Sequence, residues 1–151
     1  MGYYLVLFAH LLGAAIWAGG HLVLAVSVLP KALRARRAAT ITEFEASFER
    51  IGLPALAVQV VSGLWLAERL LGSPSHWFDD TPLARTVLLK LGLLAATVAL
   101  ALHARLRLIP RLTDETLPAL AAHIVAITVV AVALVAAGAS IRLGGYPIFT
   151  R

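Results

Sequence analysis

Residues 10–21 read His-Leu-Leu-Gly-Ala-Ala-Ile-Trp-Ala-Gly-Gly-His and lie in the middle of the first long apolar segment. An imidazole is costly to leave unpaired in hydrocarbon, so two histidines in one uncharged run predict partner groups or a bound ligand. At about 100° per residue, His10 and His21 differ by only about 20° around a helix and stand about 16 Å apart along it. Both therefore face the same way. Gly20, close to that face, lets a flat group or a neighbouring helix approach the backbone.

The composition of the whole chain predicts an integral membrane protein. Of the 151 residues, 60% are hydrophobic and 14% are charged, and the mean hydropathy is +0.88. Four apolar runs are long enough to cross the roughly 30 Å hydrocarbon layer, which takes about 20 helical residues. The short loops between them favour antiparallel neighbours. We therefore expect an all-α protein, with one domain over 1–151 that is an antiparallel bundle of four transmembrane helices at about 3–29, 43–71, 82–109 and 114–143.

The charged residues predict an orientation in the membrane. The net charge is +5, but the basic residues lie at helix ends and not along one exposed face, so nucleic acid is not an expected partner. Eight of them fall beside the first and third connections, and five fall on the other side. By the positive-inside rule the first side is cytoplasmic and both termini are outside, which fits a bacterial inner membrane. The eight are Lys31, Arg34, Arg36, Arg37, Arg50, Arg105, Arg107 and Arg111; the five are Arg69, Arg85, Lys90, Arg142 and Arg151.

Local signals mark several helix ends. Thr81 followed by Pro82 is typical of an N-cap with proline at the first helical position. Pro30 is expected to kink or end the first helix. No internal repeat is evident in the sequence, and the absence of cysteine excludes disulfides and thiolate metal sites.

Counting along the predicted helices places three histidines at one depth. His21, His103 and His123 each lie about 9–14 Å from the cytoplasmic end of their helix, at 1.5 Å per residue. His10 lies nearer the outer end, at the level of Lys90 and close to the loop residue His76. The sequence therefore predicts an inner histidine layer and a less well furnished outer layer.

Bundle cores commonly hold metals and cofactors through side chains of facing helices, and histidine is a ligand of both haem iron and free metal ions. Diagonal helices are about 12–14 Å apart, which suits a haem held between two imidazoles. With the helices in the order 1-2-3-4, the diagonal pair His21 and His103 is the expected axial pair of a b-type haem. His123 is then an alternative ligand or a neighbour of the ligands. A second haem at His10 stays open, as does the alternative that each histidine only bonds a neighbouring helix.

Several short motifs follow one another in a recognisable order. They are His10-x6-Trp17-x-x-Gly20, Leu29-Pro30, Phe48-Glu49-Arg50-Ile51 with Pro54 and Gly63, Lys90-Leu91, His103, and Asp114-Glu115 with Pro118. This series resembles the copper-resistance D (CopD) superfamily of small four-helix membrane proteins. Its pattern is most similar to the membrane-embedded protoporphyrinogen IX oxidases that bind b-type haem. The resemblance implies haem-site residues at His10, Lys90 and His103, with Trp17 and Gly20 beside them.

The expected function is that of a membrane redox protein carrying one b-type haem, or two. It would pass electrons from a hydrophobic reductant, quinol or porphyrinogen, to a membrane carrier or oxygen. Copper handling, implied by the superfamily name, is an alternative. Cu(I) prefers methionine and cysteine, and this chain has one Met and no Cys. A structural or haem-sensing protein without catalysis is the other alternative, and an oligomer stays open.

Overall fold

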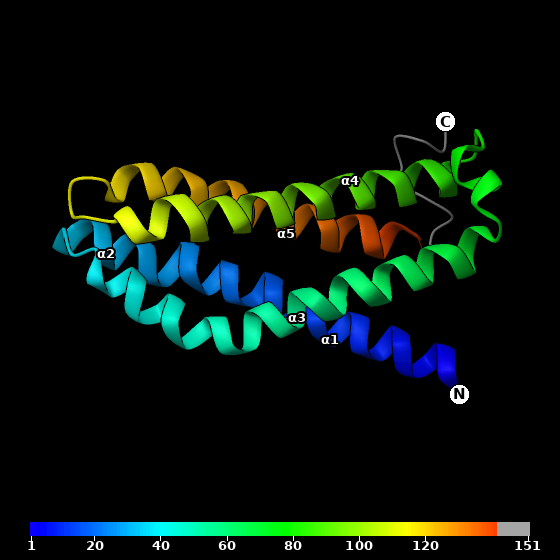
Figure 1. Cartoon of the computed structure of the whole chain (residues 1–151), viewed down its shortest axis with the longest axis horizontal. Coiled ribbons are helices and arrows are strands. Elements are labelled where there is room, and N and C mark those ends of the chain that lie inside the picture. The colour runs from blue at the N-terminus through cyan, green and yellow to red at the C-terminus, as the bar shows by residue number, and fades with distance from the viewer. Residues whose placement is uncertain (142–151) are drawn as a thin grey trace.

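The structure is a computed structural model that describes residues 1–141. It is built from long helices lying side by side (Figure 1), and residues 1–141 contain no strand. The predicted end of the last helix at 143 and the basic residues Arg142 and Arg151 lie outside the described residues. Four helical segments are long and apolar enough to cross a membrane. The predicted all-α four-helix fold is confirmed.

Short helical segments extend the first and third spans, and another lies in the connection between the second and third. The first span is α1 (Gly2–Val23), the π-helical η1 (Leu24–Val28) and α2 (Leu29–Ala35). The second is α3 (Ala39–Leu71), followed by the loop segment η2 (Pro74–Phe78). The third is α4 (Pro82–His103) with the π-helical η3 (Ala104–Leu108) and the 3-10 segment η4 (Ile109–Arg111), and the fourth is α5 (Leu117–Ile141).

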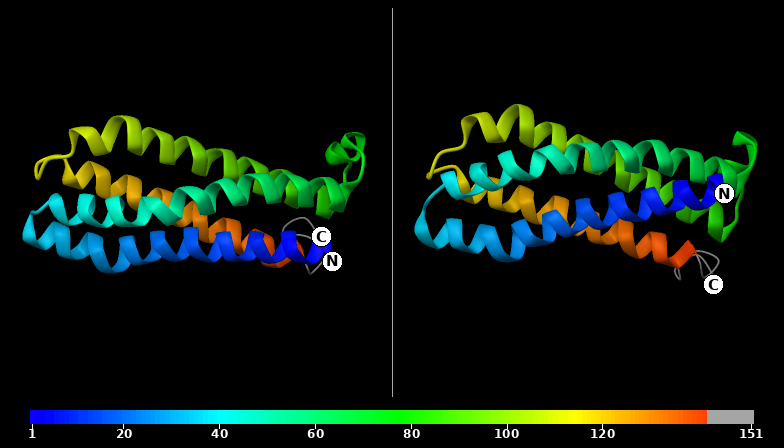
Figure 2. Two further views of the ribbon diagram at one scale, coloured as in Figure 1. Left: turned by 60° about the horizontal axis from the view of Figure 1, so that its bottom comes forward. Right: turned by 90° about the horizontal axis from the view of Figure 1, so that it is seen from below.

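The helices follow one another around the bundle in chain order. Helix α1 packs mainly against α3 and also against α5, while α4 packs mainly against α5. Among the helices that are neighbours around the bundle, α3 and α4 touch least. Helices α1 and α4 face each other diagonally. The first residues of α1 and the last residues of α5 lie at the same end of the bundle (Figure 2). We call this the outer end and the opposite one the inner end, following the predicted orientation.

Pro54 lies inside α3, and two further prolines, Pro30 and Pro110, lie inside the first and third spans. Of the two predicted effects of Pro30, a kink or the end of the first helix, the second is wrong, because the span continues to Ala35. A π-helical segment just before Pro30, and another just before Pro110, accommodates the missing N–H and the bulky ring of that proline. The π segments begin at residues 24 and 104, and the same separation in sequence joins Pro30 to Pro110. The first and third spans thus share a local design that no sequence repeat revealed.

Two helix starts differ from the predicted positions. Helix α3 begins at Ala39 and not at 43, and α5 begins at Leu117 and not at 114. The hydroxyls of Thr113 and Thr116 bond each other and nearby backbone groups, which holds a turn before α5. The third helix starts as predicted, with the Thr81 hydroxyl accepting a 3.2 Å hydrogen bond from the Ala84 N–H.

One hydrogen bond ties the two inner connections together. The backbone N–H of Ala38 donates to the carboxylate of Asp114 at 2.7 Å. Beside it, a buried apolar cluster joins the inner ends of the first, second and fourth spans: Leu24, Leu29, Ala32, Ile41, Leu117, Leu120 and Ile124. The bond therefore fixes the start of α3 relative to the start of α5.

We expect Asp114→Ala to lower the free energy of unfolding in detergent by about 1–2 kcal/mol, because it removes the charged acceptor of the Ala38 N–H. Glu115→Ala is the matched control, since Glu115 is the neighbouring exposed carboxylate. Equal stability of the two variants in a denaturant titration would contradict a role for the Asp114 bond.

Candidate functional site

A large cavity, the outer cavity, occupies the outer half of the bundle. Its volume is about 840 Å³, and all four long helices line it. Known cofactor and ligand sites measure about 300–1,000 Å³. Along α1 the lining runs from Tyr3 to Trp17, a length of about 21 Å at 1.5 Å per residue. The cavity is therefore long enough and wide enough for a ligand of cofactor size.

The most exposed large side chains of the lining lie on α1 and α5, and Leu70 of α3 is also exposed. On α1 they include Tyr4, Phe8 and Leu11, with 79%, 61% and 55% of their surface exposed, and on α5 they include Val135 with 49%. The lining contributed by α3 and α4 includes buried residues such as Leu66 and Val87. The described part of the cavity thus has exposed apolar side chains of α1 and α5 in its lining, on a surface that faces lipid in a membrane.

His10 lies on the wall of the outer cavity in a defined protonation state. The Ser62 hydroxyl donates its hydrogen to the Val58 carbonyl. Its oxygen can then only accept from the Nδ1 of His10, 2.8 Å away, so Nδ1 carries the ring proton. The other nitrogen, Nε2, has a free lone pair and no hydrogen-bond partner among residues 1–141. Metal-binding histidines are typically held this way, with one nitrogen donating to the protein and the other open.

Helix α3 fixes the position of this imidazole. The Gln59 amide donates to the His10 carbonyl. A side chain at Gly63 would lie 3.3 Å from the His10 ring, so the glycine allows the ring to rest against the backbone of α3. Ser62 and Gln59 were not among the predicted site residues. The adjacent Ser62-Gly63 pair was the available signal.

Lys90 contributes the positive charge. It is the one Lys, Arg, Asp or Glu among the described residues that line the outer cavity. Its ammonium group lies beside Gly138 of α5, where an added Cβ would come within 3.3 Å of Nζ. His10 and Lys90 therefore face the same cavity from the diagonal helices α1 and α4.

A packed layer closes the inner end of the outer cavity. Trp17 is 6% exposed and packs with Ala18, Leu56, Ile127 and Ala131. Trp17 also lines a second, smaller pocket on the other side of this layer. The indole thus separates the two spaces.

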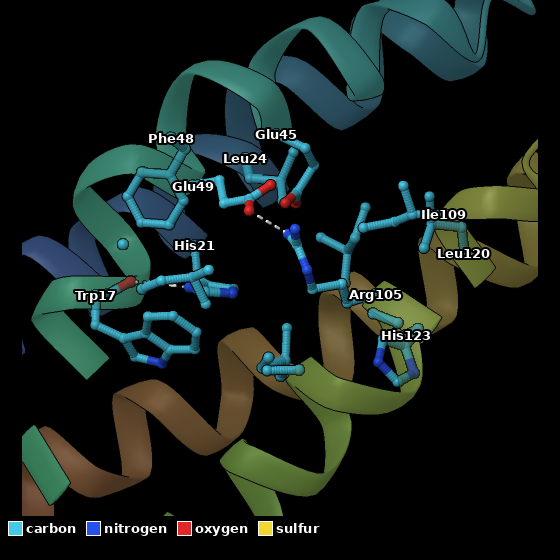
Figure 3. Close-up of a pocket in the computed structure, with 16 residues that line it drawn as sticks. Trp17, His21, Leu24, Glu45, Phe48, Glu49, Arg105, Ile109, Leu120 and His123 are labelled. Atoms are coloured by element: carbon cyan, nitrogen blue, oxygen red, sulfur yellow. Dashed lines mark hydrogen bonds and ion pairs between the residues drawn. The ribbon is translucent and has the colours of Figure 1, made fainter. Parts of the chain in front are cut away.

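The smaller pocket, the inner pocket, measures about 70 Å³ (Figure 3). His21 lies between the rings of Trp17 and Phe48, and its Nδ1 donates to the Trp17 carbonyl at 2.9 Å. Arg105 forms an ion pair with Glu49, which links the second and third spans where α3 and α4 touch least. Sequence reasoning missed this ion pair, because its two residues belong to separate helices.

The three histidines of the predicted inner layer lie near one another, but only two of them line a common pocket. His21 and His123 line the inner pocket, whereas the exposed His103 lines neither of the two cavities. The His103 ring lies 5.4 Å from that of His123, and His123 donates from Nε2 to the Leu100 carbonyl at 2.9 Å. The loop residue His76 is exposed and lines neither cavity.

The two cavities fit different groups. The inner pocket is too small for a porphyrin, so the geometry gives no support to a haem between His21 and His103. Among residues 1–141, no group of three or more His, Cys, Asp or Glu side chains could hold a metal ion. A haem makes a smaller demand, because the porphyrin supplies four of the iron ligands and the protein only the axial ones. The outer cavity, with one open imidazole nitrogen, fits a haem better than a bare metal ion.

Comparison with known families decides the relationship. A family model described as copper resistance protein D, CopD, matches residues 42–141. The chain belongs to the CopD family. Together with its four spans, this makes it an integral membrane protein. The match to the CopD model includes Lys90, His103 and His123, while α1 with His10 and Trp17 precedes it. No curated protein and no solved structure matches the chain.

Substitution of two adjacent glycines in α1, Gly19 and Gly20, can test the packing of α1 against Phe48. A Cβ on Gly20 would overlap the Phe48 ring, whereas a Cβ on Gly19 would meet nothing within 4 Å. We expect Gly20→Ala to displace Phe48 and cost about 1–3 kcal/mol through overpacking. Gly19→Ala, with the same gain in helix propensity, should be neutral or stabilising. Equal melting temperatures for the two variants would contradict the contact between Gly20 and Phe48.

Proposed function

We propose that this CopD protein binds a b-type haem in its outer cavity, with Nε2 of His10 as an axial ligand of the iron. The observation that carries the proposal is the state of His10. Its Nδ1–H is held by Ser62, its Nε2 has no partner within residues 1–141, and the residue lines a cavity of about 840 Å³. No covalent attachment is expected, because the chain has no cysteine.

Lys90 supports a porphyrin as the ligand. A haem carries two carboxylates, and a buried carboxylate needs a cationic or hydrogen-bonding partner. Lys90 provides the cation from the helix opposite His10. The proposal therefore places the haem at the outer layer, in line with the family resemblance, and ranks His10 above the pair His21 and His103.

When bound, the haem would supply one-electron chemistry. The residues of the chain determine access, since the exposed apolar lining on α1 and α5 faces the bilayer and gives lipid-soluble molecules a route to the cavity. This favours a hydrophobic reductant such as quinol or a porphyrinogen over a soluble one. The apolar walls exclude water, and Ser62 keeps the proton of His10 on Nδ1.

Copper handling is the second candidate, and the family description favours it. His10 alone is a poor copper site, since Cu(I) prefers sulfur ligands and a bare ion needs several donors. Copper would therefore need donors from a partner or from residues beyond the described part of the chain.

We expect wild-type protein purified from haem-producing cells to show the absorption bands of a b-type haem. His10→Ala should lose most of the haem, because it removes the axial nitrogen. Ser62→Ala should weaken hemin binding by about 10- to 100-fold, the usual effect of losing the group that orients a metal-binding histidine. His76→Ala is the control and should bind haem like the wild type.

Two results would contradict this assignment. One is a colourless wild-type preparation that also fails to bind added hemin. The other is full haem retention in a folded His10→Ala protein together with haem loss in His21→Ala and His103→Ala. The second result would place the haem at the inner layer.

A further inference from the structure

We propose that the inner end of the outer cavity is a binding site for the carbonyl head of a quinone, with Trp17 and Thr97 as hydrogen-bond donors. The site deepens the proposed function by naming the class of hydrophobic partner, and it rests on that function in sharing the same cavity. The proposal concerns binding, and its two donors differ from His10, Ser62 and Lys90, to which the proposed function assigns the haem.

Two buried donors without partners carry the inference. The indole Nε1 of Trp17 and the hydroxyl of Thr97 have no hydrogen-bond partner within residues 1–141. Trp17 is 6% exposed and Thr97 is 0% exposed, and both line the outer cavity. A buried polar group without a partner is destabilising, so two of them in one cavity point to a ligand that accepts hydrogen bonds.

Both donors come from the middle of their spans. Trp17 lies halfway along Gly2–Ala35, and Thr97 lies halfway along Pro82–Arg111. The midpoint of a span lies near the centre of the bilayer, about 15 Å from either polar surface. Phospholipid ester groups stay near those surfaces. A carbonyl that reaches this depth must belong to a molecule that dissolves in the hydrocarbon itself.

The donors form the deeper of two polar layers. His10 and Trp17 are seven residues apart on α1, and Lys90 and Thr97 are seven residues apart on α4. Because α1 and α4 run in the same direction, the Trp17–Thr97 layer lies about 10 Å deeper than the His10–Lys90 layer. The number of residues between His10 and Lys90 equals the number between Trp17 and Thr97, and it also equals the number between the starts of the two π segments. The matching spans thus present paired polar side chains across the cavity.

The chemistry of the inner layer selects a neutral acceptor. Its donors are an indole N–H and a hydroxyl, without a cation, so a carboxylate at this depth would be an unpaired buried charge. The carboxylates of a porphyrinogen suit the Lys90 layer instead. A quinone is neutral, dissolves in the bilayer and carries carbonyl oxygens that accept hydrogen bonds. The exposed apolar lining on α1 and α5 gives it access from the lipid.

The test measures binding of decylubiquinone to the detergent-purified full chain, with decylbenzene as the probe that lacks carbonyls. Trp17→Phe and Thr97→Val remove one donor each and nearly conserve shape. Each should weaken quinone binding by about three- to tenfold. Each should also raise the infrared carbonyl stretching frequency of the bound, isotope-labelled quinone. Thr86→Val is the matched control, because Thr86 is equally buried on α4 but lies outside the cavity lining and bonds the Pro82 carbonyl.

Weaker quinone binding in both donor variants, with Thr86→Val unchanged, would support the site. Unchanged affinity and an unchanged carbonyl frequency in both donor variants would overturn it, as would binding of decylbenzene as tight as that of the quinone. The haem content of the wild-type protein separates the two proposals. Donor-dependent quinone binding in wild-type protein that binds no haem would leave this site standing and refute the haem. Haem binding without donor-dependent quinone binding would do the reverse.

Discussion

Polar groups in a membrane bundle must find partners inside the protein, and this constraint determines which side chains are available for function. The chain meets it for most of its buried polar groups through backbone carbonyls. His21 donates to the Trp17 carbonyl, His123 to the Leu100 carbonyl, and Thr128 to the carbonyls of Ile124 and His21. These groups hold the helices together. Of the three buried side-chain atoms without a partner within residues 1–141, two belong to Trp17 and Thr97, which line one cavity, and the third belongs to the loop residue Trp77.

The arrangement of the helices follows from the same constraint. Helix α1 bonds α3 through Gln59 and Ser62, and it bonds α5 through Thr128. Helix α4 has fewer bonds to α3, and the exposed Glu49–Arg105 ion pair there adds only modest stability. The outer cavity lies among these helices, where the two diagonal members, α1 and α4, do not meet.

Much of the fold could be predicted from the sequence. The four apolar runs predicted the membrane spans, and the short loops predicted which helices are neighbours. Length and hydropathy are sufficient to predict these features of a membrane bundle. Helix ends were less accurate. The start of α3 depends on a bond between Ala38 and Asp114, which are far apart in the sequence. The continuation of the first span past Pro30 depends on a π turn, which has no sequence signature.

The site was harder to predict, because depth along a helix does not show how much space surrounds a side chain. The inner histidines share a level, but the Phe48 ring fills the space above Gly20 and leaves only the small inner pocket around His21. His10 was ranked lower because it had fewer ionisable neighbours. The open lone pair on Nε2 of His10 follows from two hydrogen bonds that only the structure shows. Nδ1 of His10 donates to the Ser62 hydroxyl, and that hydroxyl donates to the Val58 carbonyl. The ligand assignment from the sequence stays a prediction, and the outer cavity offers the larger volume.

Chemical rescue of His10→Gly tests the central claim most directly, because this substitution leaves a hole of the size of an imidazole at the wall of the outer cavity. We predict that purified His10→Gly protein, mixed with hemin, lacks the wild-type haem absorption bands and regains them when free imidazole is added. His21→Gly, treated in the same way, should show those bands without imidazole. Wild-type bands in His10→Gly without imidazole, or rescue confined to His21→Gly, would contradict the account.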